Sequence, residues 1–198
     1  MLNIFKEELI LENERVLLRP LIETDFELLL PFAQNEPDLW KYSLINAAGK
    51  EGMKNYINSS LQNKAAETEY PFIVYDKLNN SYAGCTRFYD IQQKHLTTQL
   101  GYTWYGKVFQ RSGLNRHCKL LMLTFAFEKW MLERVELRAD ANNEASINAM
   151  KAIGCSVEGI LRSNMKTDKG GRRDSIVLSI LKDEWYSNVK KQLENKTT

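Results

Sequence analysis

The chain has 198 residues, with 27 Lys or Arg against 25 Asp or Glu, so its formal net charge is only +2. That balance argues against a dedicated nucleic-acid binder, which carries a strong basic excess, and direct nucleic-acid binding is not expected. The length predicts one domain over 1–198, with a core from about residue 12 to 186. We see neither an apolar run of about 20 residues nor a signal peptide, so we expect no membrane association and a cytoplasmic location.

The cysteines and histidines suggest neither metal nor covalent chemistry. Cys85, Cys118 and Cys155 are odd in number and widely scattered, which suits neither a disulfide framework nor a zinc site. We expect them to pack as free thiols in the core. His95 and His117 have no partner at ligand or nucleophile–base spacing. No metal is expected.

The predicted elements alternate strands and helices without a linker or repeat. Thr24 and Asp25 offer caps for the first helix, and Asn79 and Asn80 tolerate a tight hairpin. Gly101, inside a strand, predicts a bulge or a close backbone approach. The order indicates a mixed α/β (α+β) fold with a mostly antiparallel sheet flanked by helices. In chain order we expect a strand at 16–20, helices at 26–32 and 51–66, strands at 72–75, 82–89 and 99–105, a helix at 114–132, a strand at 134–140, a helix at 144–153 capped by Gly154, and strands at 157–161 and 176–181 joined by a tip at 167–171.

The loop Gln110-Arg111-Ser112-Gly113-Leu114-Asn115 leads from a strand into the strongest predicted helix. A helix N-terminus presents about four unpaired N–H groups and a positive dipole end, so it forms an anion cradle. Residues 107–119 hold Lys107, Arg111, Arg116 and Lys119 and no acid, which favours a polyanionic ligand. The alternative is a solvated helix start with incidental basic residues. The loop matches neither the Walker sequence nor the dinucleotide fingerprint.

This loop resembles the Q/R-x-x-G-x-G/A pyrophosphate loop of the GNAT N-acetyltransferases, with Asn115 in place of the last small residue. The resemblance covers almost the whole chain, from Leu18-Arg19-Pro20-Leu21 and Asp25 to Asn143-Glu144-Ala145-Ser146. Met150, Lys151 and Gly154 continue the second motif, with Cys155 where an aromatic residue is usual. The segments 158–162 and 171–174 are most similar to the branch of ribosomal-protein N-terminal acetyltransferases (RimJ/RimL-like).

The resemblance implies a fold in which two neighbouring strands splay apart to admit the pantetheine chain of acetyl-CoA. The backbone of Tyr102, Thr103 and Trp104 would bind the pantetheine, and Gln110 through Asn115 the pyrophosphate. Arg111 or Arg116 would meet the ribose 3′-phosphate. Asn143 would reach the pantetheine amides and Ser146 the thioester sulfur; helix capping is the alternative role for both.

The implied reaction is direct attack of a neutral amine on the thioester, followed by protonation of the CoA thiolate. Many relatives use a Tyr as proton donor where this chain has Met150, so Ser146 becomes the candidate donor. Gln99 stands where some relatives carry a Glu base, which leaves the base unassigned. By type the candidates are Glu69, Asp90, Glu136, Asp140, Tyr102 or a water chain. An α-amine, with a pKa near 8, needs less help from a base than Lys does.

The sequence thus predicts an acetyl-CoA-dependent N-acetyltransferase acting on a primary amine, with a protein N-terminus as one acceptor. The alternatives are a small-molecule amine acetyltransferase and a non-catalytic acyl-CoA-binding regulatory module. Aromatic residues either wall an amine pocket or pack in the core. The basic segment 162–198 is either a solvated face or an approach to ribosomal RNA. A homodimer is implied only by family analogy. The aromatic candidates are Trp40, Tyr42, Trp104 and Tyr105.

Overall fold

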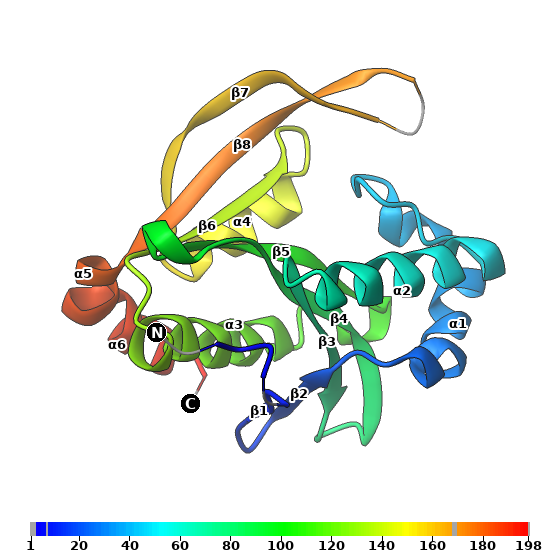
Figure 1. Cartoon of the computed structure of the whole chain (residues 1–198), viewed down its shortest axis with the longest axis horizontal. Helices are drawn as coiled ribbons and strands as arrows, with labels where there is room; N and C mark the ends of the chain where they lie inside the picture. Colours follow the sequence, from blue (N-terminus) through cyan, green and yellow to red (C-terminus); the bar gives the residue numbers. More distant parts are fainter. Residues whose placement is uncertain (1–2, 7, 168–169, 198) are drawn as a thin grey trace.

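The computed structural model describes residues 3–6, 8–167 and 170–197, and its strands form one sheet in the order β1-β2-β3-β4-β5-β6-β8-β7 (Figure 1). Every neighbouring pair is antiparallel except β5 and β6, which run parallel. The strands are β1 (Leu11–Glu12), β2 (Val16–Pro20), β3 (Glu69–Asp76), β4 (Ser81–Gln92), β5 (Thr97–Tyr105), β6 (Arg134–Asp140), β7 (Ser156–Lys166) and β8 (Arg172–Leu181); the helices are α1 (Phe26–Asn35), α2 (Gly49–Ala65), α3 (Leu114–Thr124), α4 (Glu144–Ala152), α5 (Lys182–Glu184) and α6 (Lys190–Glu194).

Both faces of the central strands are buried, because successive residues of a strand point to opposite sides. On β3, Phe72 and Val74 join the apolar cluster around α3, whereas Ile73 between them joins the cluster under α1 and α2. Figure 1 shows α3 and the red C-terminal helices together, away from α1 and α2. The mixed sheet flanked by helices is therefore confirmed, and its two faces carry separate cores.

The predicted strands and the central hairpin are confirmed, with longer bounds. Strand β2 occupies the predicted range, and Val16 and Leu18 are buried while Leu17 and Arg19 are only partly so. The β3–β4 turn places Asn80 at a φ of +48°. Asp25 stands at the N-cap of α1, yet its carboxylate accepts hydrogen bonds from the Arg19 side chain and the Ile22 amide instead of capping.

Three predictions of extent need correction. The helix expected over 114–132 is α-helical only to Thr124 and then widens into a π-helical turn at Phe125–Lys129. The final hairpin is longer than expected, and part of its predicted tip, at 168–169, lies outside the described residues. The helices after β8 and the short strand β1 had not been predicted at all.

The β7–β8 hairpin forms an arm that arches away from the helical layers in Figure 1. Most of β7 is exposed, because it is the edge strand and pairs only with β8. The Arg173 guanidinium on β8 donates to the backbone oxygen of Tyr42 at 3.2 Å, which ties the arm to the segment before α2. Within the described part of the chain, no helix is long and apolar enough to cross a bilayer.

Candidate functional site

The sheet opens between β5 and β6. These strands pair only at Thr97 with Arg134, Thr98 with Val135 and Gln99 with Glu136. Beyond these pairs, β5 keeps β4 as its partner and β6 keeps β8. The edges of β5 and β6 that face each other therefore diverge after Gln99 and Glu136. This is the splayed strand pair that the resemblance implied, and it is confirmed.

A bulge lies on β5 just inside this opening. Gly101 pairs with Arg87 and Trp104 with Cys85, so two residues of β5, Tyr102 and Thr103, oppose one residue of β4. Tyr102 adopts a φ of +48°, which is uncommon for a bulky residue. The bulge predicted from the interior glycine is therefore confirmed, next to Gly101.

The side chains of the two bulge residues lie on opposite faces of the sheet. The Tyr102 ring lies on the α2 side, with its centre 4.4 Å from the Arg87 guanidinium carbon. The Thr103 hydroxyl lies on the α3 side, where it accepts a hydrogen bond from Lys119. Because the bulge shifts the pleat by one residue, Leu100 and Thr103 both face α3 although they are three residues apart. The backbone between these two side chains lines the opening.

At the start of α3 the N-cap residue offers no side chain to the helix N–H groups, and the Ser112 hydroxyl contacts the first of them, that of Leu114, at a long 3.4 Å. Gly113 is the N-cap residue, with a φ of +87°, and it has no side chain to cap the helix. Arg111 also has a positive φ, +59°. The side chains of Gln110 and Ser112 are turned back, donating to the backbone oxygens of Tyr105 and Phe109. The loop thus has the geometry of an anion site, in which backbone groups and the helix dipole face a negative charge.

Three of the four basic residues predicted around this loop reach solvent, and one does not. Lys107, Arg111 and Arg116 reach solvent beside the helix start. Lys119 is only 4% exposed and points into the protein. The local charge of +4 expected for a surface ligand is therefore a surface charge of +3. The correction has a simple cause, since Lys119 lies on the face of α3 that packs against the sheet.

Asn115 and Lys119 fix α3 against β5. They are four residues apart and so share one face of the helix, while Thr103 and Tyr105 are two apart and share one face of the strand. The Tyr105 hydroxyl and the Asn115 side-chain oxygen lie 3.2 Å apart, and the Lys119 ammonium and the Thr103 hydroxyl 2.8 Å apart. The departure at Asn115 from the family's small residue thus has a structural role: it holds Tyr105.

Helix α4 places Asn143 and Ser146 at its first turn. Asn143 is the N-cap residue, and its side-chain oxygen accepts from the Ser146 amide at 3.1 Å. The capping alternative for Asn143 is therefore observed. Ser146 is half-buried, and among the described residues no hydrogen bond uses its hydroxyl. Met150, one turn further, is buried in the apolar cluster around α3.

The α2 side of the opening carries a paired cation that the sequence analysis missed. Arg87 on β4 is fully buried; it forms an ion pair with Glu69 and donates to the Ser60 hydroxyl at 2.8 Å. Its guanidinium also lies 4.9 Å from the ring centre of Tyr56. Burial opposes the charge of Arg87, but Tyr56 and Glu69 outweigh it and raise the guanidinium pKa. The only sequence signal for Arg87 was its spacing. It lies two residues from Cys85 and from Tyr89, so in a strand the three side chains share one face, here the face toward α2.

The four carboxylates considered as bases are all engaged. Glu69 is paired with Arg87, and Glu136 with both Arg134 and Arg138. Asp90 accepts from the side chain of Gln99, and Asp140 from that of Asn142. Burial raises the pKa of Tyr102, which makes it a weaker acid at neutral pH. The geometry therefore singles out no general base.

The four aromatic residues considered for an amine pocket do not all lie on one face of the sheet. Trp40 and Trp104 are buried together under α1 and α2, with ring centres 5.4 Å apart. Tyr105 lies on the other face of the sheet, against α3. Tyr42 is half-buried in the segment before α2. Of the two alternatives, packing in the core is observed for Trp40, Trp104 and Tyr105.

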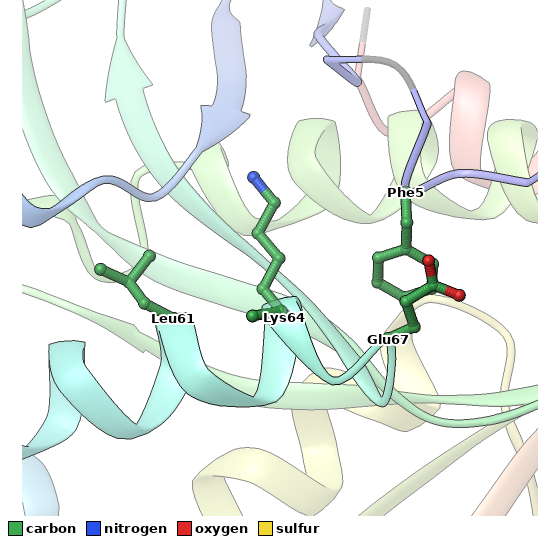
Figure 2. Close-up of a pocket in the computed structure, with 5 residues that line it drawn as sticks. Phe5, Leu61, Lys64 and Glu67 are labelled. Carbon is green, nitrogen blue, oxygen red and sulfur yellow. The ribbon is translucent and has the colours of Figure 1, made fainter.

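Two hollows of the surface lie away from the loop. Figure 2 shows one of about 310 Å³, lined by Phe5, Leu61, Lys64, Ala65 and Glu67 at the end of α2. A second, of about 220 Å³, is lined in part by Glu69 and Asp90. Neither contains a residue of 100–105 or 110–116. Within the described part of the chain, no group of three or more His, Cys, Asp or Glu is arranged to hold a metal ion.

Comparison with known proteins agrees with this geometry. The profile of the "Acetyltransferase (GNAT) domain" family matches residues 15–156. The Bacillus subtilis protein named "Putative ribosomal N-acetyltransferase YdaF" is 27% identical over 178 residues, which cover 87% of this chain and 94% of the relative. "Probable N-acetyltransferase YjcK", also of B. subtilis, is 27% identical over 176 residues, 86% of this chain and 96% of the relative.

The fold is shared with solved structures. The crystal structure of a "putative acetyltransferase" from T. thermophilus superposes with a TM-score of 0.86 at 28% identity, covering 96% of this chain and 97% of that one. The resemblance to the GNAT family is thus confirmed. The splayed strands, the α3 start without an N-cap side chain and the family match over most of the chain agree. The chain belongs to the GNAT acetyltransferase family.

Proposed function

We propose that this protein is an acetyl-CoA-dependent N-acetyltransferase that acetylates a primary amine, the N-terminal α-amine of a protein being the preferred acceptor. The observation that carries the proposal is the divergence of β5 and β6 after Gln99 and Glu136, together with the start of α3, which has no N-cap side chain and which Asn115 joins to the end of β5. An opening between strands accepts an extended chain, and a helix N-terminus accepts phosphate. The two features together match a ligand with a pantetheine arm and a pyrophosphate.

The residues present fit acetyl-CoA. The free backbone edge of Tyr102, Thr103 and Trp104 offers hydrogen bonds to the pantetheine amides, as a neighbouring strand would. The backbone of Gln110 through Asn115 cradles the pyrophosphate, with Ser112, Gly113 and Leu114 at the helix start. Arg111 and Arg116 reach solvent beside it and are available to the 3′-phosphate. Asn143 and Ser146, at the first turn of α4, complete the set that the family resemblance assigns.

Acetyl-CoA supplies a thioester whose carbonyl carbon is open to attack by a neutral amine. This chain contributes the backbone N–H groups of the bulged strand, which would stabilise the negative charge that develops on the carbonyl oxygen. Because the protein holds these groups in place before the reaction, they need not reorganise during it. The Ser146 hydroxyl is the candidate proton donor that the sequence analysis named, and Met150 at the usual donor position has no proton to give.

The acceptor proposal rests on the missing base. Gln99 does not titrate, and Glu69 and Glu136 are paired with arginines. An α-amine, with a pKa near 8, is partly neutral at cellular pH, whereas a Lys amine, near 10.4, is not. An enzyme without a dedicated base therefore suits an α-amine. The name of the relative YdaF, which refers to a ribosomal N-acetyltransferase, points the same way.

The remaining attributes are proposed with the function. We place the whole chain in one catalytic domain, because its eight strands form one sheet. The cysteines are free and buried, which suits the reducing cytoplasm. We propose no metal cofactor and no direct contact with nucleic acid, and a homodimer only by family analogy.

A peptide-library acetylation screen read by mass spectrometry, coupled to thiol release from acetyl-CoA, tests this proposal. Matched peptides that contain one Lys and carry either a free or a blocked N-terminus separate the two amine classes. The proposal predicts release with the free N-terminus and little with the blocked peptide. Release with polyamines or amino acids alone would favour the small-molecule alternative. CoA binding without release for any amine would favour the regulatory module.

A further inference from the structure

Lys119 is a buried cation without a buried anion. Its ammonium donates to the Thr103 hydroxyl at 2.8 Å and, at a longer 3.4 Å, to the Thr86 hydroxyl. Among the described residues these hydroxyls are its hydrogen-bond partners, and no carboxylate forms an ion pair with it. Lys is almost never fully buried unless it is paired, because a lone charge in the interior is costly. The free-energy cost of burying Lys119 indicates that this residue has a function.

The position of Lys119 points to that function. It lies six residues beyond Gly113 on α3, which places it about 9 Å along the helix from the proposed pyrophosphate cradle. There it meets the α3 side of the β5 bulge, where the Thr103 hydroxyl faces it. Lys119 therefore lies on the α3 side of β5, the strand that forms one edge of the opening.

The Thr103 hydroxyl is arranged to pass on a proton. It accepts from Lys119 and lies 2.8 Å from the Thr86 hydroxyl, where either oxygen can donate. When Thr86 donates, the proton of Thr103 has only a distant protein acceptor, the backbone oxygen of Gly101 at 3.4 Å. Thr103 is half-buried at the opening, so its proton can be offered to a ligand there.

We propose that Lys119, acting through the Thr103 hydroxyl, stabilises and protonates the CoA thiolate that leaves in the acetyl transfer. This proposal rests on the proposed function and names Thr103, in place of Ser146, as the proton donor. The amine nitrogen forms a bond to the carbonyl carbon and releases one proton to solvent, and the carbon–sulfur bond breaks, with its electron pair remaining on sulfur. Thr103 gives its proton to the sulfur and receives one from the Lys119 ammonium. The neutral Lys119 then regains a proton from solvent.

The electrostatics agree with this role. Burial lowers the pKa of Lys119 to about 8, close to that of an ordinary thiol, so the proton can move between them. The titratable groups that face Lys119 are Cys118 on its own helix and Cys155 after α4. Burial raises the pKa of both thiols, to about 11 and about 12, and they stay neutral at physiological pH. On the same face of β5 as Thr103, burial also raises the pKa of Tyr105.

The first test measures the bound thiol rather than turnover. Free CoA is added to the protein, and thiolate formation is followed by ultraviolet absorbance as the pH is raised. We expect the wild type to lower the pKa of the bound thiol, and Lys119→Met to raise it by at least about one unit, a tenfold loss of thiolate. Lys54→Met, which removes an exposed charge on α2, is the matched control and should leave the titration unchanged.

The second test separates binding from chemistry. Lys119→Met and Thr103→Val should lower kcat by about a hundredfold, the range of general acid catalysis, while the KM for acetyl-CoA changes little. Thr103→Ser keeps the hydroxyl and should restore most of the rate. Folding of each variant is checked by its thermal transition.

The outcomes are distinguishable. An unchanged thiol pKa in Lys119→Met, with CoA still bound, overturns the role of Lys119 and leaves the proposed function standing. A Thr103→Val variant with full kcat overturns the relay. Failure of the wild type to bind CoA overturns the proposed function and this inference together.

Discussion

The two faces of the sheet each bury a cation beside the β5 bulge, and they treat it in opposite ways. Arg87, on the α2 side, has a carboxylate, a hydroxyl and two aromatic rings around it. Lys119, on the α3 side, has two hydroxyls. A paired buried charge is a means of fixing structure, whereas an unpaired one is a standing cost. Arg87 is therefore the structural cation, and Lys119 is the one available to a ligand.

The largest expected effect tests the structural cation. Arg87→Met leaves Glu69 without its partner and should lower the free energy of unfolding by about 3 to 5 kcal/mol, as removing one partner of a buried pair does. Urea denaturation measures the loss. Adding Glu69→Gln to Arg87→Met should recover part of it. The matched variant Lys119→Met should lose little or gain, and an equal loss in both variants would contradict the contrast.

The second effect concerns pH and the unpaired cation. Above about pH 8 the native protein has released the Lys119 proton, whereas the unfolded chain holds it until about pH 10.5. The unfolded state then binds more protons, so the free energy of unfolding rises with pH across this window. The shift corresponds to a rise of about 3 kcal/mol.

This rise is isolated by comparing wild type and Lys119→Met in urea at about pH 7 and about pH 10. Other groups titrate in both proteins, and their contributions cancel in the difference. We expect the free energy of unfolding of Lys119→Met, measured relative to wild type, to be lower at the higher pH than at the lower one. A pH-independent difference between the two proteins would show that Lys119 is not a buried, titrating cation.

A smaller effect is expected at the exposed basic residues. Arg111→Ala should weaken CoA binding by about tenfold, or about 1.4 kcal/mol, because one charge-assisted hydrogen bond at the surface is lost. Calorimetric titration measures the change. The loss should vanish with dephospho-CoA if Arg111 meets the 3′-phosphate. An equal loss with both ligands would assign Arg111 to the pyrophosphate, and Arg116→Ala would then be the variant to compare.

The smallest effect should come from Asn115→Ala, which removes the partner of the buried Tyr105 hydroxyl. We expect a loss of about 1 kcal/mol in the free energy of unfolding. Thermal or urea denaturation checks it, with Tyr105→Phe in the same background as control. If Asn115→Ala costs as much in wild type as in Tyr105→Phe, the two side chains do not interact.

The sequence predicted what backbone chemistry determines and missed what packing determines. Gly101 foretold the bulge and the Gln110–Gly113 segment foretold the loop, because glycine and helix-start residues act locally. Lys119 was interpreted as a surface charge, since nothing local shows that a Lys between Cys118 and Leu120 faces the sheet. The burial of Trp185, Val189 and Leu193 was foreshadowed by their four-residue spacing, a helical signal that had gone unused.

Hydrogen–deuterium exchange with and without CoA tests the central claim most directly, namely that the opening beside the α3 start is the CoA site. The account predicts added protection at 100–105 and 110–116, where the backbone edge of β5 and the uncapped N–H groups would meet the ligand. It predicts no change at 61–67, around the hollow in Figure 2. Protection at that hollow, or none along β5 at saturating CoA, would contradict the account.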